Sequence, residues 1–167
     1  VGATKPEDYG DYFAWGETQP KSYYDWSTYK WYNYNQDYIT KYVDNKTILE
    51  LSDDAANANW GGDWRMPTKE EQVELLTECN WTLDTMNGVD GYTVTGPNGN
   101  SIYLPAAGCH NWYGIEGVGS DCYYWTSTPY NNELQNCAYE LNCAGGFIGV
   151  GASGMRCFGY SVRPVSD

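Results

Sequence analysis

The chain has 167 residues, and its 9 Lys and Arg against 22 Asp and Glu give a formal net charge of −13. This acidic balance argues against a nucleic-acid partner and against anionic membranes, because clustered Lys and Arg are what hold phosphate groups. No long apolar run predicts membrane insertion, and no signal-peptide pattern opens the chain, so an exported form would already have lost its signal. The length predicts a single domain, residues 1–167, that buries roughly 70% of its unfolded surface.

Aromatic residues dominate the composition, with 8 Trp, 17 Tyr and 3 Phe beside 19 Gly. Disordered acidic chains are poor in aromatic residues, so this composition predicts a folded domain with a ring-rich core and long loops. A surface rich in Tyr and poor in Lys also suits ligand binding, because a Tyr ring gives a rigid contact at low entropy cost. The alternative is that most Tyr side chains pack at the edge of the core.

The first half of the chain predicts irregular structure followed by two helices. Residues 1–45 are rich in aromatic and turn-forming residues and predict turns with short extended pieces. Residues 53–59 predict a short helix that stops at Gly61 and Gly62. Thr68 and Glu71 have the spacing of a capping box, which predicts a second helix. Its buried face is expected to hold Val73, Leu76 and Cys79.

The second half predicts mainly strands. Residues 91–105 read as a β-hairpin turning at residues 97–99, and residues 106–121 read as a loop broken by glycines. Four short strands are expected after it, at residues 123–130, 138–143, 146–152 and 159–165. Helices early and an antiparallel sheet late define an α+β fold.

Five segments in this order resemble one family. Residues 11–17, 54–68, 91–108, 123–128 and 159–165 are similar to the Fibrobacter succinogenes major paralogous domain, which is abundant in surface proteins of gut Bacteroidetes and related to C-type-lectin and formylglycine-generating-enzyme domains. The resemblance implies a C-type-lectin-like fold, with two helices packed on a twisted antiparallel sheet and long loops bearing the ligand. It also implies export to a cell surface or a phage particle surface.

The family usually begins with a strand, carrying a Trp and a Cys, that lies upstream of Val1 and is missing here. If that Cys normally pairs with Cys79, Cys79 is left single. The repeated motifs are interpreted as scaffold. Trp60, Trp64 and Trp125 are expected in the core, and Arg65 and Arg163 are expected to bond loop carbonyls.

The chain contains six cysteines and one histidine, which are candidate metal ligands or reactive groups. No CxxC pair is present, so the spacing predicts no zinc site. Cys109 and Cys122 are equally compatible with disulfides or buried thiols, whereas Cys137, Cys143 and Cys157 are expected to be free. His110 is expected at a loop or sheet edge.

The sequence predicts no catalytic residue, and the chain is interpreted as not an enzyme. His110 has no acidic or serine motif around it, and the active-cysteine role of the formylglycine-generating relatives transfers to no position here. The acidic pairs 53–54 and 70–71 diverge on a helix and are interpreted as solvated helix starts. No cofactor or metal is expected. A structural calcium in the acidic loops at 53–54 or 84–90 is the alternative.

A binding surface is expected in residues 130–158, where small, polar, Cys and aromatic residues follow no strand period between two regular segments. Asn and Glu would supply hydrogen bonds and the rings an apolar face, with two tyrosines at the rim. The candidate contacts are Tyr124, Tyr130, Asn131, Asn132, Asn136, Glu140, Asn142, Phe147, Ile148, Met155 and Phe158. The alternative is that residues 130–158 form an ordinary sheet edge, without a regular strand pattern and without a binding role.

Three functions fit this surface. The first is a receptor for protein or other ligands, diversified by a retroelement that randomises adenines in AAC codons. Such codons give Cys, Gly, Phe, Ile, Val, Ala and Ser but never Glu, Gln or Met. Glu133, Gln135, Glu140 and Met155 would therefore be invariant or templated by another codon. The second is an invariant glycan-binding adhesin. The third is a structural or pilus-like subunit completed by a strand from a partner chain.

Overall fold

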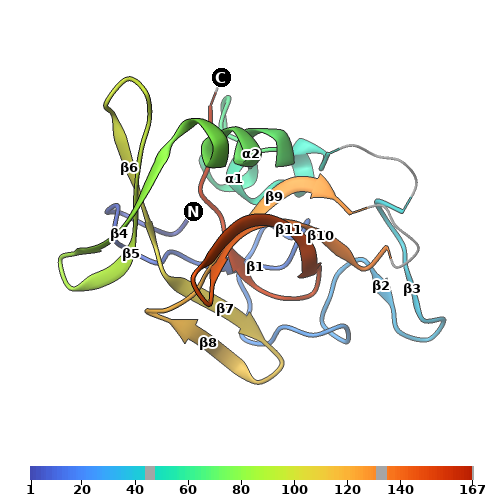
Figure 1. Cartoon of the computed structure of the whole chain (residues 1–167). Helices are drawn as coiled ribbons and strands as arrows, with labels where there is room; N and C mark the ends of the chain where they lie inside the picture. Colours follow the sequence, from blue (N-terminus) through green and yellow to red (C-terminus); the bar gives the residue numbers. More distant parts are fainter. Residues whose placement is uncertain (44–47, 131–134, 167) are drawn as a thin grey trace.

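A computed structural model describes residues 1–43, 48–130 and 135–166, and it shows a mixed α+β domain (Figure 1). The helical elements are η1 (Leu51–Asp53), α1 (Ala55–Trp60) and α2 (Lys69–Glu78). The early strands are β1 (Tyr12–Phe13), β2 (Tyr32–Asn33), β3 (Tyr38–Ile39), β4 (Asn80–Met86), β5 (Val89–Thr95) and β6 (Ser101–Pro105). The later strands are β7 (Ala107–Asn111), β8 (Gly114–Val118), β9 (Cys122–Pro129), β10 (Cys137–Ala144), β11 (Phe147–Met155) and β12 (Tyr160–Ser161).

Three sheets are present in the described residues. The largest runs in the order β1-β12-β9-β10-β11, with β7 also paired to β9 and β8 paired to β7. Strands β4, β5 and β6 form a second sheet, and β2 pairs with β3. Most pairings are antiparallel, as expected, but β9 pairs in parallel with both β7 and β12. The large sheet is therefore mixed rather than antiparallel throughout.

Helix α2 lies over the strands β9–β11, while the β4–β6 sheet and the β2–β3 hairpin extend on opposite sides of this centre (Figure 1). The predicted capping box is confirmed, because Thr68 accepts from the Glu71 amide and Glu71 accepts from the Thr68 amide at 2.7 Å. The expected buried face was partly wrong. Leu76 and Cys79 pack against the core as expected, but Val73 is exposed. Gln72 and Leu75 take its place on the buried face.

The short first helix is also confirmed. Asp54 caps it by accepting from Ala56 and Asn57, and it ends at Gly61. Asp54 is buried, however, and accepts a third hydrogen bond from Met66 at 2.8 Å. Its neighbour Asp53 is buried as well, so the interpretation of this pair as solvated was wrong.

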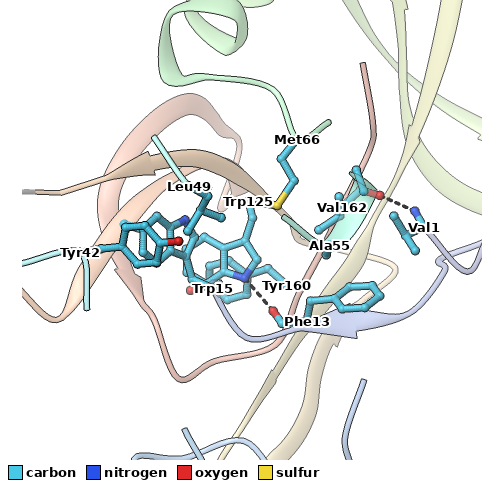
Figure 2. Close-up of a cluster of buried hydrophobic side chains, with 12 residues drawn as sticks. Val1, Phe13, Trp15, Tyr42, Leu49, Ala55, Met66, Trp125, Tyr160 and Val162 are labelled. Carbon is cyan, nitrogen blue, oxygen red and sulfur yellow. Dashed lines mark hydrogen bonds between the residues drawn. The ribbon is translucent and has the colours of Figure 1, made fainter. Parts of the chain in front are cut away.

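The central core is built from large rings. Trp15 and Trp125 are fully buried, and Tyr160 stacks on Trp125 with ring centroids 4.2 Å apart (Figure 2). The Trp125 indole donates to the Phe13 carbonyl at 2.7 Å, which ties β9 to β1 (Figure 2). The Trp15 indole donates to the Thr126 carbonyl at 2.8 Å, so each of these two tryptophans fills volume and satisfies a backbone acceptor at the same time.

Two of the three tryptophans expected in the core lie elsewhere. Trp125 is buried, but Trp60 and Trp64 are exposed and meet edge to face at 5.1 Å. The arginines behave as expected, since Arg65 contacts the Met66 carbonyl and Arg163 donates to the carbonyls of Pro6 and Asp8. Arg65 also forms an ion pair with Glu71.

The later strands confirm the hairpin at residues 91–105 and the four closing strands. Residues 106–121 correct the expected loop, because they form the β7–β8 hairpin. Strand β4 was not expected. This glycine-free segment follows α2 directly. Its strand conformation comes from pairing with β5 and not from its own pattern of apolar and polar residues.

Cys122 and Cys143 form a disulfide between neighbouring strands β9 and β10, where the two residues are register partners. The expectation of a free thiol at Cys143 was therefore wrong. Strand pairing brings its Cα to 4.9 Å from that of Cys122, a separation that sequence spacing does not reveal. Cys79, Cys109, Cys137 and Cys157 are free thiols.

Candidate functional site

A pocket of about 420 Å³ opens between the β2–β3 hairpin and the segment that leads into β10. Three rings line it, from Trp26, Tyr32 and Tyr38. The polar groups of the same pocket are the Asp37 carboxylate and the amides of Gln135 and Asn136; Ile39 completes the lining. We call this the aromatic pocket.

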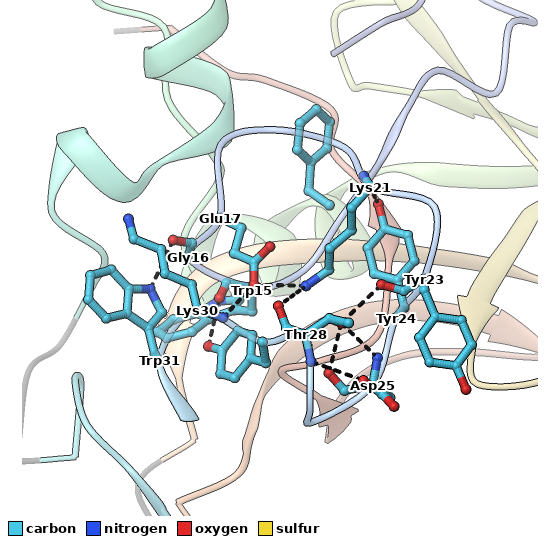
Figure 3. A network of polar contacts seen from close by, with 12 residues as sticks. Trp15, Gly16, Glu17, Lys21, Tyr23, Tyr24, Asp25, Thr28, Lys30 and Trp31 are labelled. Atoms are coloured by element: carbon cyan, nitrogen blue, oxygen red, sulfur yellow. Dashed lines mark hydrogen bonds and ion pairs between the residues drawn. The ribbon is translucent and has the colours of Figure 1, made fainter. Parts of the chain in front are cut away.

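The strand-poor segment 16–31 that carries Trp26 is held by polar contacts (Figure 3). The Glu17 carboxylate accepts from Lys21 Nζ at 2.9 Å and from the Lys30 amide at 2.8 Å. Asp25 closes a turn by accepting from the Thr28 amide at 3.0 Å. Side-chain hydrogen bonds fix the backbone conformation of this segment, where strand pairing is absent. They explain why a segment rich in turn-forming residues is well defined.

The hairpin side of the pocket is built around Asn33 and Asp37. The Asn33 side chain accepts from the amides of Asn35 and Gln36, and Asp37 adopts a left-handed conformation with φ of 56°. Tyr32 donates to the Asp37 carboxylate and lies against Trp26, with ring centroids 5.1 Å apart. The rings and the carboxylate are therefore preorganised on one wall.

The opposite wall rests on Arg156. Its backbone amide donates to the Asn136 carbonyl at 2.9 Å, and its side chain donates to the carbonyls of Cys137 and Tyr42 at 2.8 and 3.2 Å. Gln135 reaches back to the Val43 carbonyl at 3.3 Å. The entry to β10 is thus fixed to the segment that follows the hairpin.

The predicted contacts do not gather into one surface. Asn136 lines the aromatic pocket, and Met155 and Phe158 pack against the same aromatic cluster as Trp26 and Tyr32. Phe147 is exposed at the other end of the β10–β11 ribbon. Eight residues of β10 put that end roughly 25 Å from Asn136. One small ligand does not reach both.

Two predicted contacts are wrong because they are buried. Tyr124, expected at the rim, is 1% exposed and donates to the Pro105 carbonyl at 2.5 Å. Glu140 is also 1% exposed and accepts from the Gly154 amide and the Ser153 hydroxyl, both at 3.0 Å. Burial raises the pKa of the Glu140 carboxyl above its usual value, and these hydrogen bonds oppose the shift.

The remaining predicted contacts have intermediate positions. Tyr130 is half-buried and meets Tyr139 edge to face at 5.3 Å. Asn142 is half-buried and donates to Glu140 at 3.4 Å, while Ile148 packs on the core beside α2. Asn131 and Asn132 lie outside the described residues.

The sequence predicted a binding site only in the last third of the chain, so the rings of the pocket were not among the predicted contacts. A usable sign was present. Segment 23–38 alternates Trp and Tyr with Asp, Asn and Gln, the residue types that combine a stacking face with hydrogen-bonding groups.

Reactive groups elsewhere are buried or engaged. Burial raises the pKa of Cys109 to about 11 and of Cys157 to about 12, so both stay protonated at neutral pH. His110 lies on β7 with its ring centroid 4.6 Å from that of Tyr24, and burial lowers its pKa. Both thiolate and imidazolium are thereby disfavoured.

Within residues 1–43, 48–130 and 135–166, no three His, Cys, Asp or Glu side chains are placed to hold a metal ion. The acidic loops considered for calcium have other partners. Asp53 accepts from Lys41 at 2.5 Å and from Tyr42 at 2.6 Å, and Asp84 accepts from Thr93 at 2.7 Å. The described helices are all too short or too polar to cross a bilayer.

Comparison of the chain with protein-family models, curated proteins and solved structures found no match.

Proposed function

We propose that this chain is a non-enzymatic, exported binding domain of the C-type-lectin-like fold, and that it binds a glycan in the aromatic pocket. The main observation is the composition of that pocket, in which three rings and a carboxylate line one wall and two amides line the other. A sugar has an apolar face of C–H groups that packs on rings and a rim of hydroxyls that donate to carboxylate and amide oxygens. The pocket supplies both kinds of contact.

The C-type-lectin-like fold is supported by the arrangement of two helices, a twisted sheet and long connecting segments, and by the motifs noted in the sequence. A non-enzymatic role is supported by the raised pKa values of Cys109 and Cys157, which leave those thiols poor nucleophiles. Export is supported by the Cys122–Cys143 disulfide, since oxidising compartments favour such bonds.

A fixed site is favoured over a diversified one by burial. Several positions hold residue types that AAC codons can reach and yet have structural roles, since Cys143 is in the disulfide and Cys157 is fully buried. At Gly154 a β-carbon would approach the Trp125 ring to 2.5 Å. Substitution at such positions would disturb the core, whereas a diversified receptor varies exposed positions.

The test is a glycan array followed by titration calorimetry of the best hit. Trp26→Ala and Asp37→Asn are expected to weaken binding at least tenfold, because each removes one of the two kinds of contact. Asp37→Asn keeps a residue that tolerates the left-handed backbone. Trp112→Ala, an exposed ring outside the pocket, is the matched control and should bind as wild type. Binding that survives both pocket variants would refute this assignment.

A further inference from the structure

A second cavity, of about 460 Å³, opens between the β4–β6 sheet and residues 3–6, which form its N-terminal wall. The other walls are mainly apolar, with Met86 and Tyr103 from the sheet and Trp60 from the end of α1. Trp60 is 46% exposed and Ile102, on β6, is 51% exposed, so two large apolar side chains are open to solvent in one cavity. Apolar side chains gathered in this way are typical of a binding site. We call this the apolar cavity.

The N-terminal wall is held in place by hydrogen bonds from two directions. The Asp8 carboxylate accepts from the amides of Thr4 and Lys5, both at 2.9 Å, and this closes the segment into a turn. The Glu7 carboxylate accepts from the Asn87 side chain at 2.9 Å, which ties the segment to the turn between β4 and β5. The cavity is therefore formed before a ligand arrives, and binding does not have to order this wall.

Two cations line the apolar cavity, Lys5 and Arg163. Arg163 Nη2 donates to the Pro6 carbonyl at 3.3 Å, and because Pro6 follows Lys5 directly, the two cations lie in the same part of the cavity. Neither forms an ion pair within residues 1–43, 48–130 and 135–166. None of the described residues that line the cavity is Asp or Glu, although the chain contains 22 of them.

The acidic side chains next to the cavity walls are engaged in other contacts. Besides the two amides, Asp8 accepts from the Thr4 hydroxyl at 2.9 Å. Asp84 accepts from the Thr93 hydroxyl at 2.7 Å and from the Thr85 amide at 2.8 Å, and it lines a different cavity. The two cations therefore favour an anion from outside the chain, and a carboxylate matches the planar donors of a guanidinium.

The hydroxyl groups of the cavity argue against a second sugar site. Three hydroxyls line it, those of Thr4, Thr93 and Ser101, and each is hydrogen-bonded within the chain, to Asp8, Asp84 and Thr95 respectively. A sugar in this cavity would have to share these groups, and a hydroxyl buried without a partner costs binding free energy. An alkyl chain makes no such demand on the walls.

We propose that the apolar cavity is a second binding site, for a medium-chain alkyl carboxylate. The alkyl chain packs on Trp60, Met86 and Ile102, and the carboxylate lies beside Lys5 and Arg163. The volume of about 460 Å³ is within the roughly 300–1,000 Å³ of cavities that bind small molecules. This site is independent of the glycan proposal, because the aromatic pocket shares none of its lining.

The probe is octanoate, titrated calorimetrically into the whole chain. Hexanoate is expected to bind about tenfold more weakly, because two fewer methylene groups are buried. Octan-1-ol, which has the same chain without the charge, is expected to bind at least threefold more weakly, because it lacks the attraction of the two cations. These comparisons use the wild-type protein, so they do not depend on how well a variant folds.

Ile102→Glu tests the position of the site. The variant places a carboxylate in the cavity and removes an apolar contact, so octanoate should bind at least tenfold more weakly. Ile115→Glu, at an isoleucine of similar exposure on β8 outside the cavity, is the matched control and should bind as wild type. Equal affinity of the wild type for octanoate and octan-1-ol, unchanged binding by Ile102→Glu, or no binding of octanoate at millimolar concentration overturns the proposal.

Discussion

Arg156 shows how one residue joins the core to the aromatic pocket. It is fully buried, its guanidinium lies 4.6 Å from the Trp15 ring, and its side chain donates to two carbonyls. Its Nη2 has no partner, and no carboxylate forms an ion pair with it in the described chain. Ring stacking and carbonyl bonds therefore hold this charge in place of an ion pair.

Arg156→Lys should lower the free energy of unfolding by about 3 kcal/mol. A lysine carries a single ammonium, which does not reproduce the planar stack on Trp15 or both carbonyl bonds. Urea unfolding followed by tryptophan fluorescence measures the change. Lys69→Met is the control, since this cation lies over a ring, Tyr139, outside the core. A wild-type midpoint for Arg156→Lys would show that its carbonyl bonds add nothing.

At the scale of elements, the sequence predicted what local chemistry decides. Thr68 and Glu71 define the start of α2 by spacing alone, and the turn at 97–99 defines the β5–β6 hairpin. Tertiary contacts decided the rest. Strand β4 exists because β5 pairs with it. Residues 106–121 form strands because β7 pairs with β8 and, at Gly108, with Cys122 of β9. Glycines in that segment had suggested a loop.

The candidate site, too, was predicted only in part from the sequence. Asn136 was predicted in a binding region and does line the aromatic pocket, but its partners Trp26 and Tyr38 come from a segment about 100 residues earlier in the chain. Glu140 was predicted as a contact because it is polar, and only the packing of β10 against β11 reveals that its carboxylate points inward. The sequence indicates which residue types suit a binding site, but the pairing of the strands determines which side chains come into contact.

The start of α2 gives a prediction about pH. Hydrogen bonds from Arg65, then from Thr68, lower the pKa of Glu71 from 4.5 to about 2. A carboxyl with a lowered folded pKa stabilises the fold above its unfolded pKa and loses that effect as pH falls through the folded value. Glu71→Gln should therefore cost about 1 kcal/mol at neutral pH, because the capping box and the Arg65 pair are lost.

The difference between wild type and Glu71→Gln should shrink as the pH falls from 4.5 towards 2. Urea unfolding at several pH values measures it. Glu74→Gln, an exposed change on the same helix, is the control and should remain near wild type throughout. A difference that does not vary between pH 7 and pH 2 would show that the cap acts without the charge.

At the scale of the whole molecule, most of the Lys and Arg residues that the structure describes are buried or form ion pairs. Lys21, Lys30, Lys41 and Arg65 form ion pairs with acidic residues, and Arg156 lies in the core. The outside is thus strongly acidic, which suits a neutral glycan in the aromatic pocket. The β2–β3 hairpin, which carries the aromatic pocket, and the β4–β6 sheet lie on opposite sides of the molecule (Figure 1).

The Cys122–Cys143 disulfide acts on the whole molecule through the unfolded chain. It closes a loop across 21 residues, and loop closure of that length stabilises a fold by about 3 kcal/mol. Reduction should therefore lower the free energy of unfolding by about that amount, as should the Cys122→Ala/Cys143→Ala double variant. Chemical unfolding with and without reductant measures both, and the double variant itself should not respond to reductant.

Thiol counting checks the same assignment chemically. Alkylation of the unfolded, unreduced protein should label four cysteines, Cys79, Cys109, Cys137 and Cys157, and prior reduction should expose all six. In the folded protein Cys109 and Cys157 should react slowly at neutral pH, because burial raises their pKa values to about 11 and about 12. Mass spectrometry of the labelled peptides identifies the pair. Labelling of Cys122 or Cys143 without reductant would mean that strand pairing alone joins β9 to β10.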